Sequence, residues 1–366
     1  MKLSKKEEQL HLGGVVDESE KDNTAPVVRY EITSYGADYD VAGFVARLER
    51  NDIVVPPFQR DYVWRITEAS RFIESLLLGL PVPGVFLAKD PDSNRLLVID
   101  GQQRLKTLQF FLKGVFNPKP NDKTNKVFEL TNLSSRFDGL TYRDLPEADR
   151  RHLDDYVIHA TIVKQDKPTN NDTSIYHIFE RINATGQRLT PQEIRVAVYH
   201  GCLFELLEEL NEDSNWRKVF GKPNARLKDR ELILRFLAFY FEADSYERPL
   251  GEFLNKFAAK HRSPKENEMQ EFRDVFCKTI EVVCASFGTD AFRPERALNA
   301  AVFDSVMVGI ARRLKRGHVV NPDDINIAYR KLLKDEGYLA TVSQSTADES
   351  TVEKRLKLAT QAFAHV

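Results

Sequence analysis

The sequence predicts an α+β domain followed by an all-helical domain, and three observations indicate this order. Between about residues 27 and 163, short apolar segments of strand length alternate with helical patterns. After residue 174 the strand-like segments nearly vanish and helical patterns follow one another. The chain has 366 residues, 42% hydrophobic and 30% charged, which is enough for two cores. The predicted divisions are a flexible arm over residues 1–25, the α+β domain over 26–170 and the helical domain over 171–366.

The predicted arm is charged, contains glycine and has no steady period, as is typical of mobile termini. Each strand predicted after it is a short apolar segment bounded by polar or turn residues. These strands cover residues 52–55, 84–88, 96–99, 126–130 and 156–163. Apolar residues at helical spacing predict a helix over residues 69–80, which Pro81 and Pro83 end, and another over residues 105–112.

The helical domain begins with a clear signal for a helix N-terminus. Thr190, Pro191 and Glu193 fit a capping box with proline at the first helical position. A second cap is predicted at Asn321, and Gly337 is expected to end the helix that follows it. The further helices are predicted at about residues 227–242, 249–260, 267–286, 294–316 and 322–336, with a last helix after a linker at 341–351.

The overall composition excludes several classes of protein. Lys+Arg is 53 and Asp+Glu is 55, so the formal net charge of −2 excludes a globally basic nucleic-acid binder. The three cysteines show no CxxC pair, which argues against a zinc site or a disulfide framework and favours a reducing compartment. The N-terminus lacks the apolar core of a signal peptide, and no apolar run could span a bilayer. We therefore expect a cytoplasmic protein with no membrane partner.

The most informative segment is LLVIDGQQRLKTLQFFL, residues 96–112. A buried strand leads into Asp100 and Gly101, and a helix is predicted to begin at about Gln102. Glycine permits a tight turn and a close approach of a ligand to the backbone. The first amides of a helix have no acceptor within the helix, so this N-terminus favours an anion.

The side chains around this turn suit a phosphate group. Arg104 offers a planar, permanently charged donor group, and Lys106 and Thr107 would add a charge and a hydroxyl one turn later. Asp100 either binds a metal ion or caps the helix, and the sequence leaves both open. A well-capped surface helix without a ligand is the alternative. The segment is not a Walker A loop, because GxxxxGK[ST] is absent.

Two further segments contribute candidate residues. In VPPFQRDYVWR, residues 55–65, Gln59 and Arg60 echo the Gln-Arg pair of the first motif, whereas the aromatic side chains are expected in the core. In IFERINATGQRLTPQE, residues 178–193, Asn183 and Thr185 could hold a base or a phosphate and Gly186 permits a positive φ. The alternative for the second segment is an ordinary connection between two helices.

Two basic segments of the helical domain are weaker candidates for contacts with DNA phosphates. They are ARRLKRGH, residues 311–318, and RLKDRELILRF, residues 226–236. A solvent-exposed helix face is the alternative for both.

Taken together, the motifs resemble a known family. PPFQRDYVW, GLPVPGVFL, VIDGQQRLKTL and FERINATGQRLTPQE occur in this order, and they resemble the N-terminal domain family of GmrSD-type modification-dependent restriction enzymes. The resemblance covers roughly residues 40–200. It implies a ParB/sulfiredoxin-like fold and a nucleotide-binding, often hydrolysing module of phage defence. By similarity, residues 100–104 line the nucleotide site, Gln59 and Arg60 lie near it, and the turn at 183–186 closes it.

The expected function is therefore that of a nucleoside-triphosphate-binding and hydrolysing regulatory subunit of a restriction system that attacks modified phage DNA. Mg²⁺ or another divalent cation is expected with the nucleotide. In this reading Arg104 stabilises phosphate charge, Gln102 or Gln103 positions water, and Asp100 holds the metal through water. The alternatives are a non-hydrolysing nucleotide- or DNA-binding switch and a metal-dependent nuclease.

The resemblance also implies partners. Fused members of the family end in an HNH-type nuclease, which needs a His-Asn-His constellation around a metal. The C-terminal region shows no such constellation in its sequence. A separate HNH-type nuclease subunit is therefore the expected partner, and a homodimer is also consistent with the resemblance.

Overall fold

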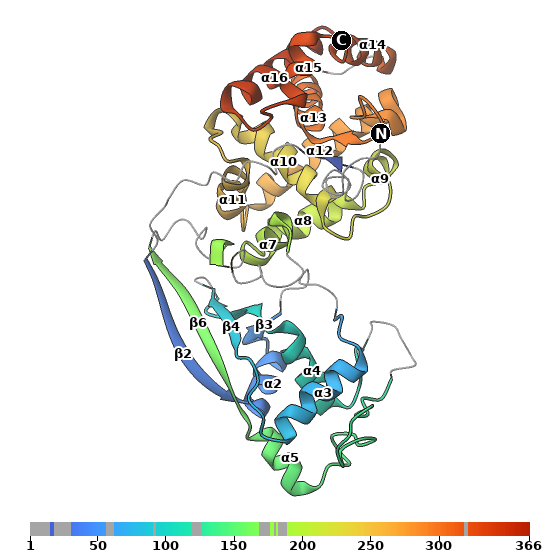
Figure 1. Ribbon diagram of the computed structural model, residues 1–366. Coiled ribbons are helices and arrows are strands. Elements are labelled where there is room, and N and C mark those ends of the chain that lie inside the picture. The colour runs from blue at the N-terminus through green and yellow to red at the C-terminus, as the bar shows by residue number, and fades with distance from the viewer. Residues whose placement is uncertain are drawn as a thin grey trace. The chain divides into compact units, whose positions relative to one another are not determined.

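The structure is a computed structural model that describes residues 15–17, 31–55, 62–90, 93–118, 126–167, 176–178, 181, 189–317 and 321–366. The chain forms two compact units. One is Arg29–Leu189, and the other combines Met1–Val28 with Thr190–Val366. The first unit is α+β and the second is helical, so the predicted fold class is confirmed (Figure 1).

A five-stranded sheet forms the framework of the α+β unit, in the order β2-β6-β4-β5-β3. Its strands are β2 (Glu31–Asp40), β3 (Ile53–Val54), β4 (Val85–Lys89), β5 (Leu96–Asp100) and β6 (Val157–Lys167). The pairs β4·β6 and β3·β5 are parallel, whereas β2·β6 and β4·β5 are antiparallel. Strand β5 is therefore flanked on both sides, and its buried residues Leu97, Val98 and Ile99 lead to Asp100 at its end.

Four of the predicted strands are confirmed and one prediction is wrong. Residues 126–130 form no strand, and Val127 makes only an isolated bridge with Val115. The sequence did not predict β2, because this edge strand is exposed along most of its length and mixes polar with apolar residues. An edge strand with two partly solvated faces lacks the alternation that identifies a strand in sequence.

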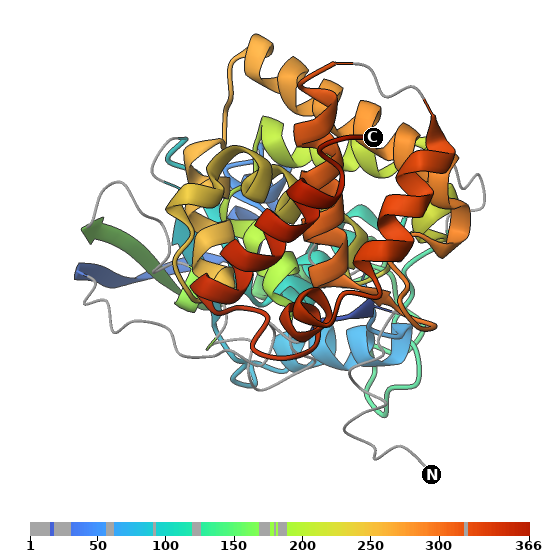
Figure 2. The ribbon, with the colours of Figure 1, turned by 90° about the horizontal axis from the view of Figure 1, so that it is seen from above.

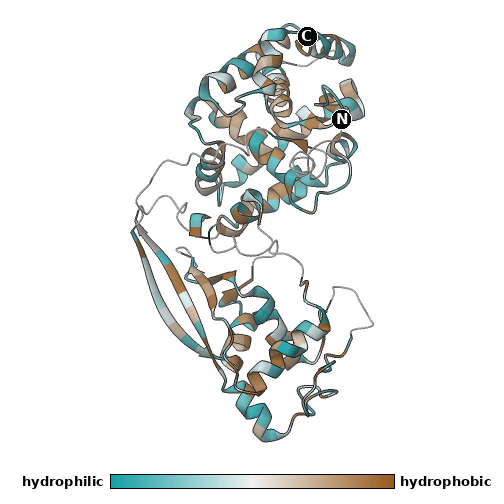
Figure 3. Cartoon of the chain, viewed as in Figure 1, coloured by the Kyte–Doolittle hydropathy of each residue, from teal (hydrophilic) through white to brown (hydrophobic). Residues whose placement is uncertain are grey.

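Four helices of the α+β unit bury their apolar faces in a common core with the sheet. They are α2 (Val41–Glu49), α3 (Ile66–Leu77), α4 (Gln102–Lys113) and α5 (Glu147–Asp154). Along α3 the buried residues recur at helical spacing, as the sequence predicted. Figure 3 shows that α5 is mostly hydrophilic whereas strand β4 is mostly hydrophobic, and Leu153 is the buried residue of α5.

The helical unit is built around α13, which runs from Ala300 to Leu314 and is buried along most of its length. Figure 2 shows α16 (Glu349–Ala362) in dark red, close to the C-terminus of the chain. The backbone of α16 packs closely against α13, because a Cβ at Gly309 would lie only 3.0 Å from the carbonyl of Ala359. The other α-helices described here are α7 (Pro191–Val198), α8 (Cys202–Asn211), α9 (Ser214–Phe220), α10 (Lys228–Glu242), α11 (Leu250–Lys260), α12 (Glu266–Phe287), α14 (Pro322–Leu332), α15 (Glu336–Ser343) and α16 (Glu349–Ala362).

The caps of these helices test the sequence signals directly. The capping box at Thr190 is confirmed, since Thr190 N–H donates to Glu193 at 2.6 Å and Glu193 N–H donates to the Thr190 hydroxyl at 3.2 Å. Asn321 caps α14, also as predicted. The prediction for Gly337 is wrong, because this residue lies inside α15, which begins after the cap Asp335.

Part of the predicted flexible arm is an ordered element of the helical unit. Strand β1 (Val15–Val16) pairs in parallel with β7 (Leu298–Asn299). Val15 of this strand and Asp17, the residue that follows it, are both buried. The polar composition of residues 1–25 concealed this, because two residues of strand and one carboxylate give no recognisable period.

Candidate functional site

The turn between β5 and α4 has the backbone that the sequence predicted. Gly101 has a φ of +99° and is the N-cap of α4, and its carbonyl accepts from Leu105 N–H at 2.9 Å. A Cβ at this position would lie 2.5 Å from Cγ1 of Val85 on the neighbouring strand β4. Both the positive φ and the contact with Val85 require glycine here.

The N-terminus of α4 has no side-chain cap. The alternative in which Asp100 caps the helix is therefore wrong: Asp100 is the last residue of β5, and its carboxylate pairs with Arg104 instead. The N-cap residue of this twelve-residue helix therefore contributes no capping oxygen to the first amides, which carry the partial positive charge of the helix N-terminus. This arrangement favours an anion at the turn.

Arg104 folds back over the turn. Its Nη2 donates to Oδ2 of Asp100 at 2.8 Å, and the same nitrogen lies 3.3 Å from the position that a Cβ on Gly101 would occupy. The Arg104 side chain is 16% exposed and that of Asp100 is 46% exposed. The Nε of Arg104 is buried and has no hydrogen-bond partner within the described part of the chain. The guanidinium thus places its positive charge beside the helix N-terminus.

Gln103 binds the segment that follows Gln59 and Arg60 in the sequence. Its Oε1 accepts from the backbone N–H groups of Val63, at 3.0 Å, and Trp64, at 3.3 Å. This amide oxygen is therefore engaged in joining two distant parts of the sequence. Gln102 is the first residue of α4, and both glutamines are partly exposed.

Thr107 has a structural contact in place of the expected ligand contact. It is fully buried, and its hydroxyl donates to the carbonyl of Gln103 at 2.7 Å and shares a 2.7 Å hydrogen bond with the hydroxyl of Tyr62. The expectation that Thr107 contacts a phosphate is corrected by this burial. Tyr62 lies in the core, as expected, with its ring 4.9 Å from that of Phe110.

We expect the buried phenol of Tyr62 to make the fold sensitive to alkaline pH. Burial raises the pKa of Tyr62 from 10.0 to about 12. The neutral phenol therefore contributes stability that is fully present below pH 10 and is lost as the pH rises toward 12. Urea unfolding of the wild type and Tyr62→Phe at pH 9 and pH 11 checks this. The advantage of the wild type should shrink at pH 11, and a constant difference would contradict the assignment.

We also expect Gln103→Leu to destabilise the α+β unit by about 1–2 kcal/mol, because the amides of Val63 and Trp64 lose their acceptor. Gln109→Leu on the same helix is the matched control, since no hydrogen bond of the Gln109 side chain is found among the described residues. The free energies of unfolding from urea titrations compare the two. Equal losses would show that the Gln103 contacts add nothing.

The remaining predicted site residues divide into two groups. Lys106 lies on α4 one turn after Gln102, and both side chains are partly exposed. Gln59, Arg60, Asn183, Thr185 and Gly186 lie outside the described residues. The sequence did not reveal that Tyr62 and Gln103 clamp the two motifs together, because contacts across 40 or more residues leave no local pattern.

The basic segment 226–236 does not form a phosphate-facing stripe. Lys228 and Arg235 are buried and paired with carboxylates. Arg226 pairs with Glu193 at 3.3 Å, and Arg230 pairs with Glu208 at 3.1 Å. In the second basic segment, Arg312 and Arg313 are bonded within the helical unit, to Thr360 and to backbone carbonyls. The charges in the sequence alone could not show which Lys and Arg side chains pair inside the helical unit and which face solvent.

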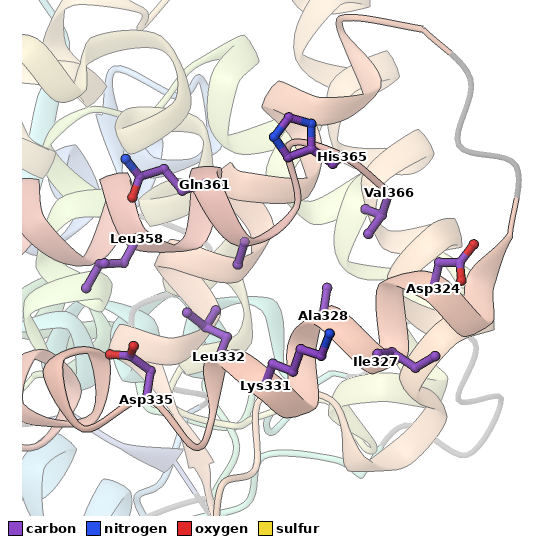
Figure 4. Close-up of a pocket in the computed structure, with 11 residues that line it drawn as sticks. Asp324, Ile327, Ala328, Lys331, Leu332, Asp335, Leu358, Gln361, His365 and Val366 are labelled. Carbon is purple, nitrogen blue, oxygen red and sulfur yellow. The ribbon is translucent and has the colours of Figure 1, made fainter.

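The helical unit contains a groove of about 740 Å³ between α14 and α16 (Figure 4). Apolar residues such as Ile327 and Leu358 line it together with Lys331, Asp335 and Gln361. None of its lining residues is a predicted site residue. Within the described ranges no group of three or more His, Cys, Asp or Glu side chains is arranged to hold a metal ion. Every helix searched in those ranges is too short or too polar to cross a bilayer.

Comparison with known families finds a match for part of the chain. Residues 41–200 match the family of the GmrSD restriction endonuclease, N-terminal domain. This range begins with α2, includes the β5–α4 turn and ends after α7. No curated protein matches the chain. The match confirms the resemblance read from the motifs and connects this part of the chain with restriction systems.

Proposed function

Because residues 41–200 belong to the N-terminal domain family of GmrSD restriction endonucleases, we propose that the chain binds and hydrolyses a nucleoside triphosphate as the regulatory subunit of a modification-dependent restriction system. The nucleotide phosphates bind at the N-terminus of α4. The observation that carries this proposal is the Arg104 guanidinium folded over Gly101 at the N-terminus of α4.

The β5–α4 turn combines three features that suit a phosphate. Gly101 adopts the positive φ of the turn, the N-terminus of the twelve-residue helix α4 follows it directly, and Arg104 adds a charged donor. In phosphoryl transfer, positive charge held in place stabilises the charge that develops on the transferred group. Arg104 is the residue of this turn that supplies such a charge.

Asp100 is the residue that would hold Mg²⁺. Its carboxylate is partly exposed at the start of the turn and pairs with Arg104 at 2.8 Å. Mg²⁺ commonly uses one or two carboxylates and takes its other ligands from water and phosphates, so a single carboxylate at this turn is compatible with it. Bound with the nucleotide, the ion would supply charge neutralisation of the phosphates. Asp100 and Arg104 would then each exchange their present ion pair for the metal and a phosphate.

The other residues of the proposal come from the family resemblance. Gln59 and Arg60 precede Tyr62 in the sequence, and the hydroxyl of Tyr62 contacts Thr107 of α4. In the proposal Gln59 and Arg60 lie near the nucleotide site, as the resemblance implies. Gln102 positions water, and Lys106 adds charge one turn into α4. Asn183, Thr185 and Gly186 close the site.

The partners in this proposal are modified phage DNA and a separate HNH-type nuclease subunit, with a homodimer as the assembly of the chain itself. They rest on the family match rather than on a surface of this structure. Recombinant chain that cut DNA with Mg²⁺ and no partner would refute the separate nuclease and would favour the metal-dependent nuclease instead.

Phosphate release tests the proposed reaction. ATP, GTP, CTP and UTP are each incubated with Mg²⁺, with and without DNA, and the wild type is compared with Arg104→Ala. We expect turnover of at least one nucleotide by the wild type and its loss in a folded Arg104→Ala variant. Binding without turnover would replace the reaction with a nucleotide-dependent switch. If the chain neither bound nor hydrolysed any of the four nucleotides, the proposal would be overturned.

A further inference from the structure

The sheet of the α+β unit carries partly exposed residues on the face that lies opposite to the helices. Successive residues of a strand point to opposite faces, and residues that are paired across neighbouring strands share a face. Val85 of β4 and its partner Ala160 of β6 belong to the core that the sheet forms with the helices. Phe86 and its partner Thr161 therefore lie on the other face, and both are partly exposed.

Phe86 lies beside the β5–α4 turn. It is paired directly with Asp100, the last residue of β5, so the Cα atoms of the two residues are about 5 Å apart. Farther along the same face, Ala88 and its partners Leu97 and Val163 are buried. The accessible part of this face is therefore the end at which β5 leads into the proposed phosphate site.

An oriented imidazole lies on the same face. A Cβ on Gly36, the β2 partner of Thr161, would lie 2.6 Å from Cε1 of His159, so the imidazole covers Gly36 on this face. Nδ1 of His159 hydrogen-bonds to Oδ1 of Asp38 at 2.8 Å. Because an ionised carboxylate only accepts hydrogen bonds, Nδ1 is the donor, and Nε2 of the neutral ring is left as an acceptor. The His159 side chain is 60% exposed, and Nε2 has no hydrogen-bond partner among the described residues.

These groups suit the nucleoside part of a nucleotide. An aromatic ring stacks on any base, and an imidazole nitrogen accepts a hydrogen bond from a base N–H or a ribose O–H. Strands β5 and β6 are two strand spacings apart, about 9–10 Å, and β4 with Phe86 lies between them. Because the ribose separates a base from its phosphates, one nucleotide can place its phosphates at the end of β5 and its base over β4 and β6.

We propose that the nucleoside part of the ligand binds on this face, with its base stacked on Phe86 and with Nε2 of His159 accepting a hydrogen bond from the base or the ribose. This inference rests on the proposed nucleotide site and adds the residues that distinguish a nucleotide from a bare phosphate chain. Asp38 is a positioning residue in it, because its hydrogen bond fixes the tautomer and the plane of the imidazole.

A comparison of nucleotides with inorganic triphosphate tests this site in the full chain. Equilibrium binding of ATP, GTP, CTP, UTP and inorganic triphosphate, each with Mg²⁺, is measured for the wild type, Phe86→Ala, Phe86→Leu and His159→Ala. Loss of base stacking should weaken binding of the preferred nucleotide about 5- to 100-fold in Phe86→Ala. Loss of one hydrogen bond should weaken it about 2- to 10-fold in His159→Ala. The affinity for inorganic triphosphate should stay unchanged, because the phosphates bind at the turn.

Tyr35→Ala is the matched control. Tyr35 is also an exposed aromatic residue of the sheet, but it is paired with Ile162 of the core and so lies on the helix-covered face. This variant should bind nucleotide and triphosphate as the wild type does. If Phe86→Ala folds poorly, Phe86→Leu keeps apolar bulk without the ring and should show the same selective loss.

Two results would overturn the nucleoside site alone. One is unchanged nucleotide affinity in the folded Phe86 and His159 variants, and the other is a wild type that binds inorganic triphosphate as tightly as every nucleotide. A wild type that binds neither triphosphate nor any nucleotide would overturn the proposed function, and the nucleoside site with it.

Discussion

Replacing Gly101 with alanine is expected to destabilise the α+β unit by about 2–4 kcal/mol and to remove nucleotide binding. A non-glycine residue at a φ of +99° costs about 1–2 kcal/mol, and the new Cβ would overlap Cγ1 of Val85 at 2.5 Å, which adds an overpacking cost of similar size. Relief of that overlap would move the turn and the first amides of α4. Urea unfolding and a nucleotide titration measure the two effects.

Gly114 provides the control for this substitution within the same helix. It lies at the C-terminal end of α4 with a φ of +75°, but a Cβ there would meet no atom within 4 Å. Gly114→Ala should therefore cost only the backbone strain of about 1–2 kcal/mol and leave nucleotide binding intact. The double variant Val85→Ala with Gly101→Ala should lose less stability than the sum of the losses measured for the two single variants. Equal losses for Gly101→Ala and Gly114→Ala would contradict the role of Val85.

Removing the carboxylate of Asp304 is expected to cost about 3–5 kcal/mol, the largest stability loss that we predict. Asp304 is fully buried between Arg235, at 2.6 Å, and Arg355, at 3.6 Å. Asp304→Ala leaves two buried guanidinium groups without this partner, and an uncompensated buried charge is far costlier than a lost surface pair. Urea unfolding with circular dichroism at 222 nm provides the measurement.

Asp348→Ala is the control for Asp304→Ala, because it breaks the ion pair between Asp348 and Arg248. The side chains of this pair are 40% and 38% exposed. Exposed pairs contribute about 0–1 kcal/mol, so this variant should unfold close to the wild type. Asp304→Asn retains the shape of the side chain and one acceptor oxygen, so its loss of stability should lie between those of Asp304→Ala and Asp348→Ala. A loss below about 1 kcal/mol for Asp304→Ala would show that the buried ion pairs of Asp304 do not stabilise the helical unit.

The sequence predicted the parts of the fold in which local pattern and burial agree. The apolar segment before Asp100 forms β5, and Thr190 caps α7 with the predicted box. It failed where tertiary contacts decide the structure. Strand β2 is exposed along an edge, and Val15–Asp17 gain their order from β7 and from cations more than 200 residues away.

The candidate site shows the same division. Gly101 was predicted from the strand-to-helix turn, and its positive φ agrees. The roles of Asp100 and Thr107 could not be predicted, because a carboxylate before a helix can cap it or pair with an arginine, and a hydroxyl on a helix can face either way. The orientation of α4 against Tyr62 decides these roles, and that contact spans 45 residues of sequence.

The measurement that tests the central claim most directly is nucleotide affinity with and without the Arg104 guanidinium. Equilibrium binding of ATP, GTP, CTP and UTP with Mg²⁺ is compared for the wild type, Arg104→Ala and Arg50→Ala. Arg50 also pairs with an aspartate, Asp52 at 3.1 Å, but its side chain is 63% exposed and lies outside the turn. A hydrogen bond to a charged group contributes about 1.5–3 kcal/mol, so Arg104→Ala should weaken binding of the preferred nucleotide about 10- to 100-fold. Arg50→Ala should leave it unchanged, and unchanged affinity in a folded Arg104→Ala variant would contradict a phosphate site at the N-terminus of α4.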